Sequence, residues 1–350
     1  MMSVAPTLSP RLSRSGDGTV RALLARRDVQ LIPIMVVIAV VSGIANPAFL
    51  SSRVISSLLI TAMVTTLMAL GQTFVMLTKG IDLSVAPILG LSAVIVGFQA
   101  QDHGLPLGLG LLLGAGIGVV LGAGNALLVS ILRVPPIIAT LGTFTVYGGL
   151  QFLVTNGSQV NTVPSEYTRF GVASFTVVPG VPWLLIAGVI ATIVAGYVLR
   201  YTVFGRSLYA VGDDVEAAFR GGIPTARVTF IAYVVCGFFA GLAGVIYLMR
   251  TGSADALTGT QTNENLNSIA AALIGGAALT GGRGNALGAL LGSIFLSLTL
   301  SAMGIAAHIP DEWQPAGIGV LILLAVVADP RARQGTRVRS RLRKKKDGTR

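Results

Sequence analysis

Residues 78–87, TKGIDLSVAP, place a lysine and an aspartate between two long apolar runs. The preceding run (54–77) and the following run (85–100) contain no charged residue. Uncharged runs of this length suit helices that cross a hydrocarbon core of ~30 Å. Lys79 and Asp82 stand beside Gly80 and Pro87, and charge next to helix-interrupting residues at membrane depth is costly and marks functional sites. The stretch therefore predicts a membrane protein with a functional break between two spans.

Composition supports the same class of protein. Hydrophobic residues make up 53% of the 350 residues and charged residues only 11%, against about 25% charged residues in soluble domains. The apolar runs are continuous, whereas the strands of a porin-type barrel would alternate apolar and polar residues. The sequence therefore predicts an all-α membrane protein.

We expect about ten transmembrane helices in one permease domain, residues 30–328, arranged as two inverted five-span halves. The expected spans are 30–48, 54–77, 83–100, 105–132, 135–153, 182–199, 227–249, 266–280, 285–304 and 314–328. The third span of each half begins with polar residues, and paired irregular spans at matching positions of inverted halves are typical of transport pathways.

The distribution of basic residues predicts the orientation. With the N-terminus inside, the inner segments hold 22 of the 25 Lys and Arg residues, and only Arg53, Arg169 and Arg250 fall outside. An excess of Lys and Arg marks the cytoplasmic side. We therefore expect basic cytoplasmic tails at 1–29, poorly ordered, and at 329–350. The net charge of +11 then reflects membrane topology and indicates no nucleic-acid partner.

Two connections are long. The segment 154–181 falls on the outer side, where it could cap the mouth of a pathway or meet an extracytoplasmic partner; a plain connector is the alternative. The segment 200–226 falls on the inner side.

The inner segment contains the pattern of a short capped helix. Asp213 precedes Glu216 by three residues, which is the spacing of a capping box. Residues 215–220 then suit a helix that stops at the glycine pair 221–222, and Pro224 blocks its extension. We favour a partner-docking helix over a solvated turn.

Polar residues at the starts of spans 3 and 8 and within span 4 are candidates for a pathway or gate. The alternative for the two acidic residues is a helix-end anchor, because a carboxylate at a helix N-terminus is stabilised by the backbone dipole. The candidate residues are Lys79, Asp82, Ser84, Asn125, Glu264 and Asn267.

Several functions are excluded by what the sequence lacks. No Gly-x-x-x-x-Gly-Lys-Ser/Thr loop for nucleotide phosphates occurs. The two histidines, His103 and His308, are far apart, and Cys236 is the only cysteine, so no metal-ligand cluster is expected. No nucleophile and base stand together. We therefore expect a protein that is not an enzyme and that carries no cofactor.

Four blocks of the sequence resemble a known family. Gly80-Ile-Asp-Leu-Ser84 looks like a signature of the membrane permeases of ribose/xylose/galactose-type ABC importers. The blocks 134–142, 204–223 and 265–284 resemble further blocks of that family in order and spacing. The resemblance covers about residues 30–330.

The resemblance implies a permease of ten spans that forms a dimer with a second copy or a close homologue. It also implies a cytoplasmic ABC ATPase and a periplasmic sugar-binding protein as partners. The loop before span 7 would dock on the ATPase as a coupling helix. Carried over to this sequence, the coupling role falls on Gly212, Asp213, Asp214, Glu216, Ala217, Ala218 and Arg220.

The sequence therefore predicts the permease subunit of an ATP-driven importer in a bacterial inner membrane, for a pentose, a hexose or a related polyol. No tight sugar site stands out in the membrane region, so specificity would rest with the binding protein. Two alternatives stay open. One is a permease for branched-chain amino acids or nucleosides, and the other is an ion-coupled secondary transporter that uses Asp82 or Glu264.

Overall fold

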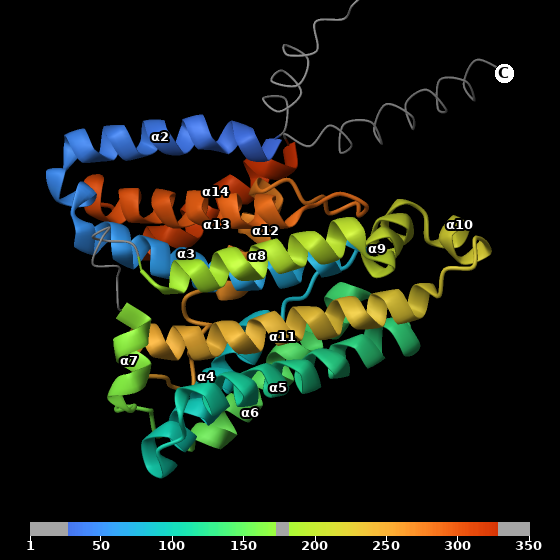
Figure 1. Cartoon of the computed structure of the whole chain (residues 1–350), viewed down its shortest axis with the longest axis horizontal. Helices are drawn as coiled ribbons and strands as arrows, with labels where there is room; N and C mark the ends of the chain where they lie inside the picture. Colours follow the sequence, from blue (N-terminus) through green and yellow to red (C-terminus); the bar gives the residue numbers. More distant parts are fainter. Residues whose placement is uncertain (1–26, 173–181, 328–350) are drawn as a thin grey trace, which may run out of the picture.

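The computed structural model describes residues 27–172 and 182–327, which form helices joined by turns and loops (Figure 1). The expectations for the tails 1–29 and 329–350 lie outside the described residues, apart from residues 27–29, which open the first helix. No strand is present within the described ranges. The all-α class predicted from the sequence is confirmed.

The helices follow one another with short connections. In chain order they are α2 (Arg27–Ala45), α3 (Ser52–Leu77), α4 (Val85–His103), α5 (Leu107–Ala126), α6 (Pro136–Thr155), α7 (Ser165–Val172), α8 (Leu184–Tyr201), α9 (Val203–Asp213), α10 (Val215–Arg220), α11 (Thr225–Thr251), α12 (Glu264–Ile274), α13 (Ala286–Ser301) and α14 (Gln314–Val327). π-helical turns extend α5 over Leu127–Ile131 and α13 over Ala302–Ala306. Single 3-10 turns cover Pro47–Leu50 and Asp311–Trp313.

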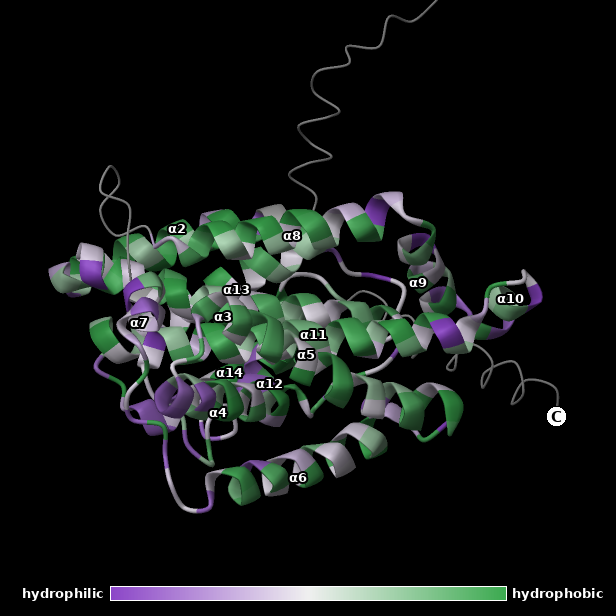
Figure 2. Cartoon of the chain, turned by 60° about the horizontal axis from the view of Figure 1, so that its bottom comes forward, coloured by the Kyte–Doolittle hydropathy of each residue, from purple (hydrophilic) through white to green (hydrophobic). Residues whose placement is uncertain are grey.

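The long helices lie lengthwise along the molecule, with α7 at one end and α9 and α10 at the other (Figure 1). We call these the α7 end and the α10 end. Apolar residues cover the bodies of the helices, and hydrophilic residues gather near their ends, including α7 and α10 (Figure 2). This banding is what a membrane-spanning bundle requires, because the hydrocarbon core cannot solvate polar side chains.

Seven of the described helices are long and apolar enough to cross a membrane: α3, α4, α5 with its π turn, α6, α8, α11 and α13 with its π turn. The other three predicted spans correspond to α2, α12 and α14. The predicted span 266–280 is too long, since α12 ends at Ile274. Gly276, at φ 96°, turns the chain there, and 11 residues of helix reach only about 16 Å.

The basic residues separate to the two ends of the bundle. Those of the predicted inner loops lie in the turns and helix ends that meet at the α10 end: Lys79, Arg133, Arg200, Arg206, Arg220, Arg227 and Arg283. Arg53 opens α3, Arg169 lies in α7 and Arg250 lies in the last turn of α11, all towards the α7 end. The two groups of basic residues that the sequence separated therefore lie at opposite ends of the molecule.

Helices α3, α4 and α11 form the buried centre of the bundle, and α5 crosses α11 at very short range. A Cβ built on Gly118 would overlap the backbone of Gly237, and one on Gly237 would overlap that of Gly118. One turn along, a Cβ on Gly241 would overlap the carbonyl of Gly114. Small residues at this spacing let membrane helices pack backbone to backbone. The glycines of this crossing therefore serve packing.

Candidate functional site

Asp82 lies in the turn between α3 and α4 and has no exposed surface. Its carboxylate accepts hydrogen bonds from the backbone N–H of Ser84, at 2.9 Å, and from the Ser84 hydroxyl, at 2.7 Å. Asn125, in the last turn of α5, donates its Nδ2 to Oδ2 of Asp82 at 3.2 Å and to the Ser84 hydroxyl at 2.6 Å. These three residues, the carboxylate cluster, join the start of α4 to the end of α5.

The backbone around Asp82 is held as firmly as its side chain. The amide of Gln72, in α3, donates to the Asp82 carbonyl at 3.3 Å and accepts from the Asp82 N–H at 3.4 Å. Thr140, in α6, donates its hydroxyl to the carbonyl of Ile81 at 3.1 Å. The Cys236 thiol of α11 lies 3.8 Å from the Gln72 amide oxygen. Side chains of α3 and α6 therefore hold the backbone of this turn, and α11 contacts the Gln72 side chain.

Neutral groups alone stabilise the Asp82 carboxylate, because no lysine or arginine of the described residues forms an ion pair with it. Two buried polar atoms beside it have no hydrogen-bond partner in the described parts of the chain: the amide oxygen of Asn125 and the hydroxyl of Tyr233. A Cβ on Gly80 would fall 2.5 Å from that hydroxyl. The turn thus packs directly on Tyr233 of α11. The Tyr233 hydroxyl and the Asn125 amide oxygen could each form a further hydrogen bond.

The same turn contacts the α10 end through glycines. Lys79 adopts a left-handed backbone, with φ 67°, and its ammonium donates to the carbonyl of Asp213 at 3.2 Å. The N–H of Gly282 donates to the carbonyl of Leu77 at 3.1 Å. Gly212 has no room for a side chain, since a Cβ there would overlap the Leu77 carbonyl and the Gly282 nitrogen. We call this meeting of residues 77–80, 212–213 and 281–282 the glycine junction.

Helix α10 has the predicted bounds, but its cap differs from the prediction. Asp214 is the N-cap, and its carboxylate accepts from the N–H groups of Glu216, at 2.9 Å, and Ala217, at 3.0 Å. These two hydrogen bonds hold the pKa of Asp214 below its ordinary value. Asp213 instead ends α9. The capping-box spacing therefore predicted the helix correctly but selected Asp213 as its cap, whereas the cap is the next residue, Asp214.

The predicted coupling residues divide between exposed and buried positions. Gly212 and Ala218 are buried, and the others are exposed: Asp213, Asp214, Glu216, Ala217 and Arg220. Glu216 and Arg220 form an ion pair one turn apart. Phe219, which the sequence reasoning did not select, is 68% exposed and lines a cleft of about 730 Å³ between α10 and the start of α11. The α10 end therefore presents charge and one aromatic side chain outward.

Glu264 and Asn267 form a second group, towards the α7 end. They are 6% and 7% exposed in the first turns of α12. The Asn267 amide donates to the carbonyl of Thr262 at 3.2 Å, while Oε2 of Glu264 and Oδ1 of Asn267 have no partner among the described residues. The predicted pathway residues thus form two groups at different levels along α11, with Lys79 in the glycine junction beside the first.

Some residues of the site escaped the sequence reasoning. Gln72 and Tyr233 surround Asp82 from α3 and α11, and Gly281 and Gly282 meet the α3–α4 turn from the α12–α13 connection. Gln72 carried a signal, because it is the one amide side chain in the run 54–77. Tyr233 carried none, because nothing in its own span sets it apart.

Comparison with known proteins identifies relatives over most of the chain. Residues 54–326 match the family described as "Branched-chain amino acid transport system / permease component". The chain is 34% identical to the autoinducer 2 import system permease protein LsrC of Klebsiella pneumoniae, over 90% of this chain and 89% of the relative. It is 33% identical to that of Photorhabdus laumondii, over 88% and 90%, and 32% identical to that of Escherichia coli, over 88% of each. No solved structure matches.

The match over residues 54–326, the apolar helices long enough to span a membrane and the buried polar groups between them agree with one another. The chain belongs to the family of membrane permeases described as the permease component of the branched-chain amino acid transport system, and it is a transport subunit, not an enzyme.

Proposed function

We propose that this chain is the membrane-spanning subunit of an ATP-driven ABC importer for a small sugar-like polyol. The α10 end docks on a cytoplasmic ATPase, and the carboxylate cluster and the glycine junction carry the ATPase motion into the bundle. The observation that carries this proposal is the link between an exposed, capped helix and a buried turn. Helix α9, which leads directly into α10, touches the turn that holds Asp82: Lys79 donates to the Asp213 carbonyl, and Gly212 packs against the Leu77 carbonyl.

The orientation follows from the charges. With the α10 end in the cytoplasm, the seven basic residues gathered there obey the positive-inside rule, and both termini lie inside if α2, α12 and α14 complete ten crossings. The periplasmic sugar-binding protein then meets the α7 end. A second copy of the chain or a close homologue completes the pathway.

Helix α9 and the turn at residues 77–80 are closely packed. Gly212 sits against the Leu77 carbonyl, and the Lys79 side chain reaches the carbonyl that ends α9. A displacement of α9 and α10 therefore displaces residues 77–80, and with them the backbone of Asp82. The unpaired Tyr233 hydroxyl and Asn125 oxygen offer hydrogen bonds to a second arrangement of this turn. The carboxylate cluster acts in this proposal as a hinge of the gate.

The curated relatives support import of a small molecule, since each is named an autoinducer 2 import permease. Branched-chain amino acids, named in the description of the family, are the competing substrate class. An ion-coupled mechanism finds less support. Asp82 has no exposed surface, and neutral donors already occupy its carboxylate.

The docking assignment is tested in liposomes that contain the permease, its ATPase and its binding protein. Glu216→Lys reverses an exposed charge whose ion pair with Arg220 contributes about 0–1 kcal/mol to stability. Phe219→Ala removes the exposed aromatic, and aromatic anchors contribute ~2 kcal/mol or more to an interface. We expect at least a roughly tenfold lower ATP-dependent uptake in each variant, with normal membrane insertion.

Ile193→Ala is the matched control, because Ile193 is 64% exposed in the middle of α8, away from both ends of the molecule. Its uptake should equal that of the wild type. If Glu216→Lys and Phe219→Ala also transport normally, α10 does not dock on the ATPase. Uptake by the isolated chain under an ion gradient would instead establish a secondary transporter.

A further inference from the structure

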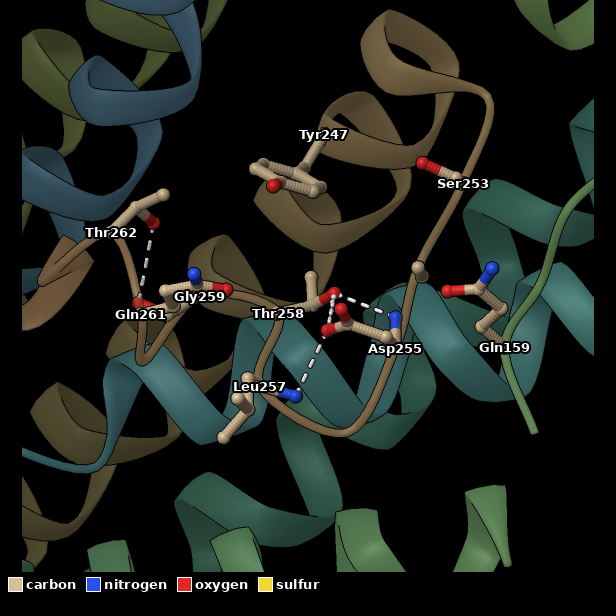
Figure 3. A pocket seen from close by; sticks show the side chains of 10 residues that line it. Gln159, Tyr247, Ser253, Asp255, Leu257, Thr258, Gly259, Gln261 and Thr262 are labelled. Atoms are coloured by element: carbon tan, nitrogen blue, oxygen red, sulfur yellow. Dashed lines mark hydrogen bonds between the residues drawn. The ribbon is translucent and has the colours of Figure 1, made fainter. Parts of the chain in front are cut away.

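The connection between α11 and α12, residues 252–263, is folded into a compact polar loop at the α7 end. The Asp255 carboxylate accepts from the Leu257 N–H at 2.9 Å and from the Thr258 hydroxyl at 3.0 Å. The Thr258 hydroxyl accepts in turn from the Asp255 N–H at 2.8 Å. Figure 3 shows these two side chains at the centre of the loop. The loop therefore has one defined shape.

Two other segments, α6 and the stretch around Val160, hold the loop in place through hydrogen bonds. Gln151 of α6 has no exposed surface and donates its amide to the carbonyls of Asp255, at 2.9 Å, and Thr258, at 3.1 Å. Val160 pairs with Ala254 through backbone hydrogen bonds of 2.8 and 3.2 Å. A loop held by a buried amide and by a backbone pair is preorganised, and preorganisation lowers the cost of binding a ligand.

The loop encloses a pocket of about 90 Å³ with a mostly polar lining (Figure 3). Hydroxyls, amides and one aromatic ring contribute to it, and no lysine or arginine of the described residues does. The side-chain amides of Gln159 and Gln261 have no hydrogen-bond partner among the described residues. The lining includes Gln159, Tyr247, Asp255, Thr258, Gln261 and Thr262.

Unused hydrogen-bond acceptors lie behind the Thr262 side of this pocket. Asn267 donates to the Thr262 carbonyl at 3.2 Å, yet its own Oδ1 and Oε2 of Glu264 have no partner among the described residues. Both residues are more than nine-tenths buried. Neither residue lines the pocket itself, but buried polar atoms are normally hydrogen-bonded, so the unpaired oxygens show that the Thr262 side of the pocket has polar surroundings.

The chemistry of the lining selects the ligand class. Hydroxyl groups both donate and accept, so they can satisfy the amides of Gln159 and Gln261 together with nearby carboxylate and carbonyl oxygens. The ring of Tyr247 can cover the C–H face of a sugar. A branched-chain amino acid would require an apolar pocket for its side chain and a cation for its carboxylate. The volume equals that of roughly three water molecules, so the pocket fits one edge of a small ligand.

We propose that this pocket is a reception site that holds one edge of a small polyhydroxylated substrate before translocation. The inference rests on the proposed function for the side of the membrane that the pocket faces. It goes beyond the expectation, drawn from the sequence, that no tight sugar site stands out in the membrane region. Those groups come from the end of α11, from the loop after it and from residue 159, so they converge only in the fold.

The test measures binding of D-ribose to the complete permease–ATPase complex in detergent, by saturation-transfer NMR, with L-leucine as the competing probe. Gln261→Ala and Thr262→Ala are the test variants. Thr260→Ala is the matched control, because Thr260 lies in the same loop and also donates its hydroxyl to a backbone carbonyl but does not line the pocket. We expect wild type and Thr260→Ala to bind ribose alike, and each test variant to bind about tenfold more weakly, which corresponds to about 1.4 kcal/mol.

Any of three results would overturn the inference. The first is that the wild-type complex does not bind ribose at about 100 mM, a concentration that would reveal even millimolar affinity. The others are equal ribose affinities in all four proteins and binding of leucine in preference to ribose. ATP-dependent uptake, measured separately in liposomes, reports on the proposed function. If uptake fails while the ribose titrations follow the expected pattern, the proposed function falls and the pocket stands. If uptake is normal while the ribose affinities are equal, the proposed function stands and the pocket is not a reception site.

Discussion

A carboxylate without exposed surface destabilises a fold unless donors surround its oxygens. Asp82 meets this condition with the Ser84 N–H, the Ser84 hydroxyl and the Asn125 amide. The arrangement makes Asp82 an anchor for the N-terminus of α4 as well as a candidate hinge, which are the two interpretations that the sequence left open. They are compatible, because a hinge needs a fixed point about which the chain turns.

Replacement of Asp82 by alanine should strongly destabilise the protein. It leaves buried donors of Ser84 and Asn125 unpaired, and each unpaired group costs about 1–3 kcal/mol. Asp82→Asn retains one acceptor oxygen and should cost less. Thermal unfolding midpoints in detergent should therefore fall in the order wild type, Asp82→Asn, Asp82→Ala. Asp102→Ala, at an exposed aspartate near the end of α4, is the control, and a midpoint for Asp82→Ala equal to that of Asp102→Ala would contradict the assignment.

The close packing around Gly212 leaves no room for a side chain. A methyl group there would overlap the Leu77 carbonyl and the Gly282 nitrogen, so Gly212→Ala should separate the three segments of the glycine junction. We expect ATP hydrolysis by the complex to continue while uptake drops roughly tenfold or more, since overpacking of this kind costs about 1–3 kcal/mol. Gly148→Ala, where nothing lies within 4 Å of the added Cβ, should leave both rates unchanged. Equal uptake by the two variants would show that the junction does not transmit motion.

Sequence reasoning found the polar residues of the site but could not pair them. Asp82 and Asn125 are 43 residues apart, and no periodicity within one helix predicts a contact between two helix ends. Gln151 donates to the carbonyls of a loop that lies 104 to 107 residues later in the chain, and no local pattern around it predicts this contact. Partners of this kind depend on tertiary packing.

At the level of elements, local signals predicted α10 well. Its bounds, its glycine stop and the proline before α11 all agree with the structure. The error of one residue in the cap arose because Asp213 and Asp214 are adjacent and the longer helix α9 takes Asp213 as its last residue. Helices α7 and α9 were not predicted, since short helices carry weak periodic signals in loops.

The cap of α10 predicts a pH dependence. Because hydrogen bonds from Glu216 and Ala217 lower the pKa of Asp214, the carboxylate stabilises the helix above the ordinary pKa of an aspartate, and this stabilisation disappears as the pH falls through the lowered value. A spin label at Phe219→Cys should stay ordered from neutral pH down to the ordinary aspartate range and become mobile only below it.

In an Asp214→Asn background the same label should show no transition in that range. An unchanged transition in that variant would assign the titration to another group. Cys236 does not interfere with the labelling, because it is buried.

For the whole molecule, composition and charge predicted the class and the two faces, whereas the count of ten spans stays a prediction beyond the seven long apolar helices of the described residues. Hydropathy measures how apolar a segment is, and it cannot show whether a buried segment such as α12 crosses the membrane or ends within the bundle.

The topology itself can be measured. Fluorescent reporters fused separately to the N-terminus and the C-terminus should both be active in the cytoplasm, since the basic residues of the α10 end belong on that side. A thiol reagent that cannot cross the membrane should modify Arg169→Cys, towards the α7 end, and not Arg220→Cys, at the α10 end, in intact cells. Modification of Arg220→Cys alone would invert the proposed orientation.

The glycine crossing of α5 and α11 also constrains when the protein can assemble. Gly237 follows Gly118 by about 120 residues, and a ribosome adds roughly 5–20 residues per second. For several seconds after insertion, α5 therefore presents its row of glycines to the lipid before its own partner has been synthesised. Any neighbouring helix with a similar row could occupy that face first. Slow translation between the two helices should then lower the yield of active permease without any change in its final structure.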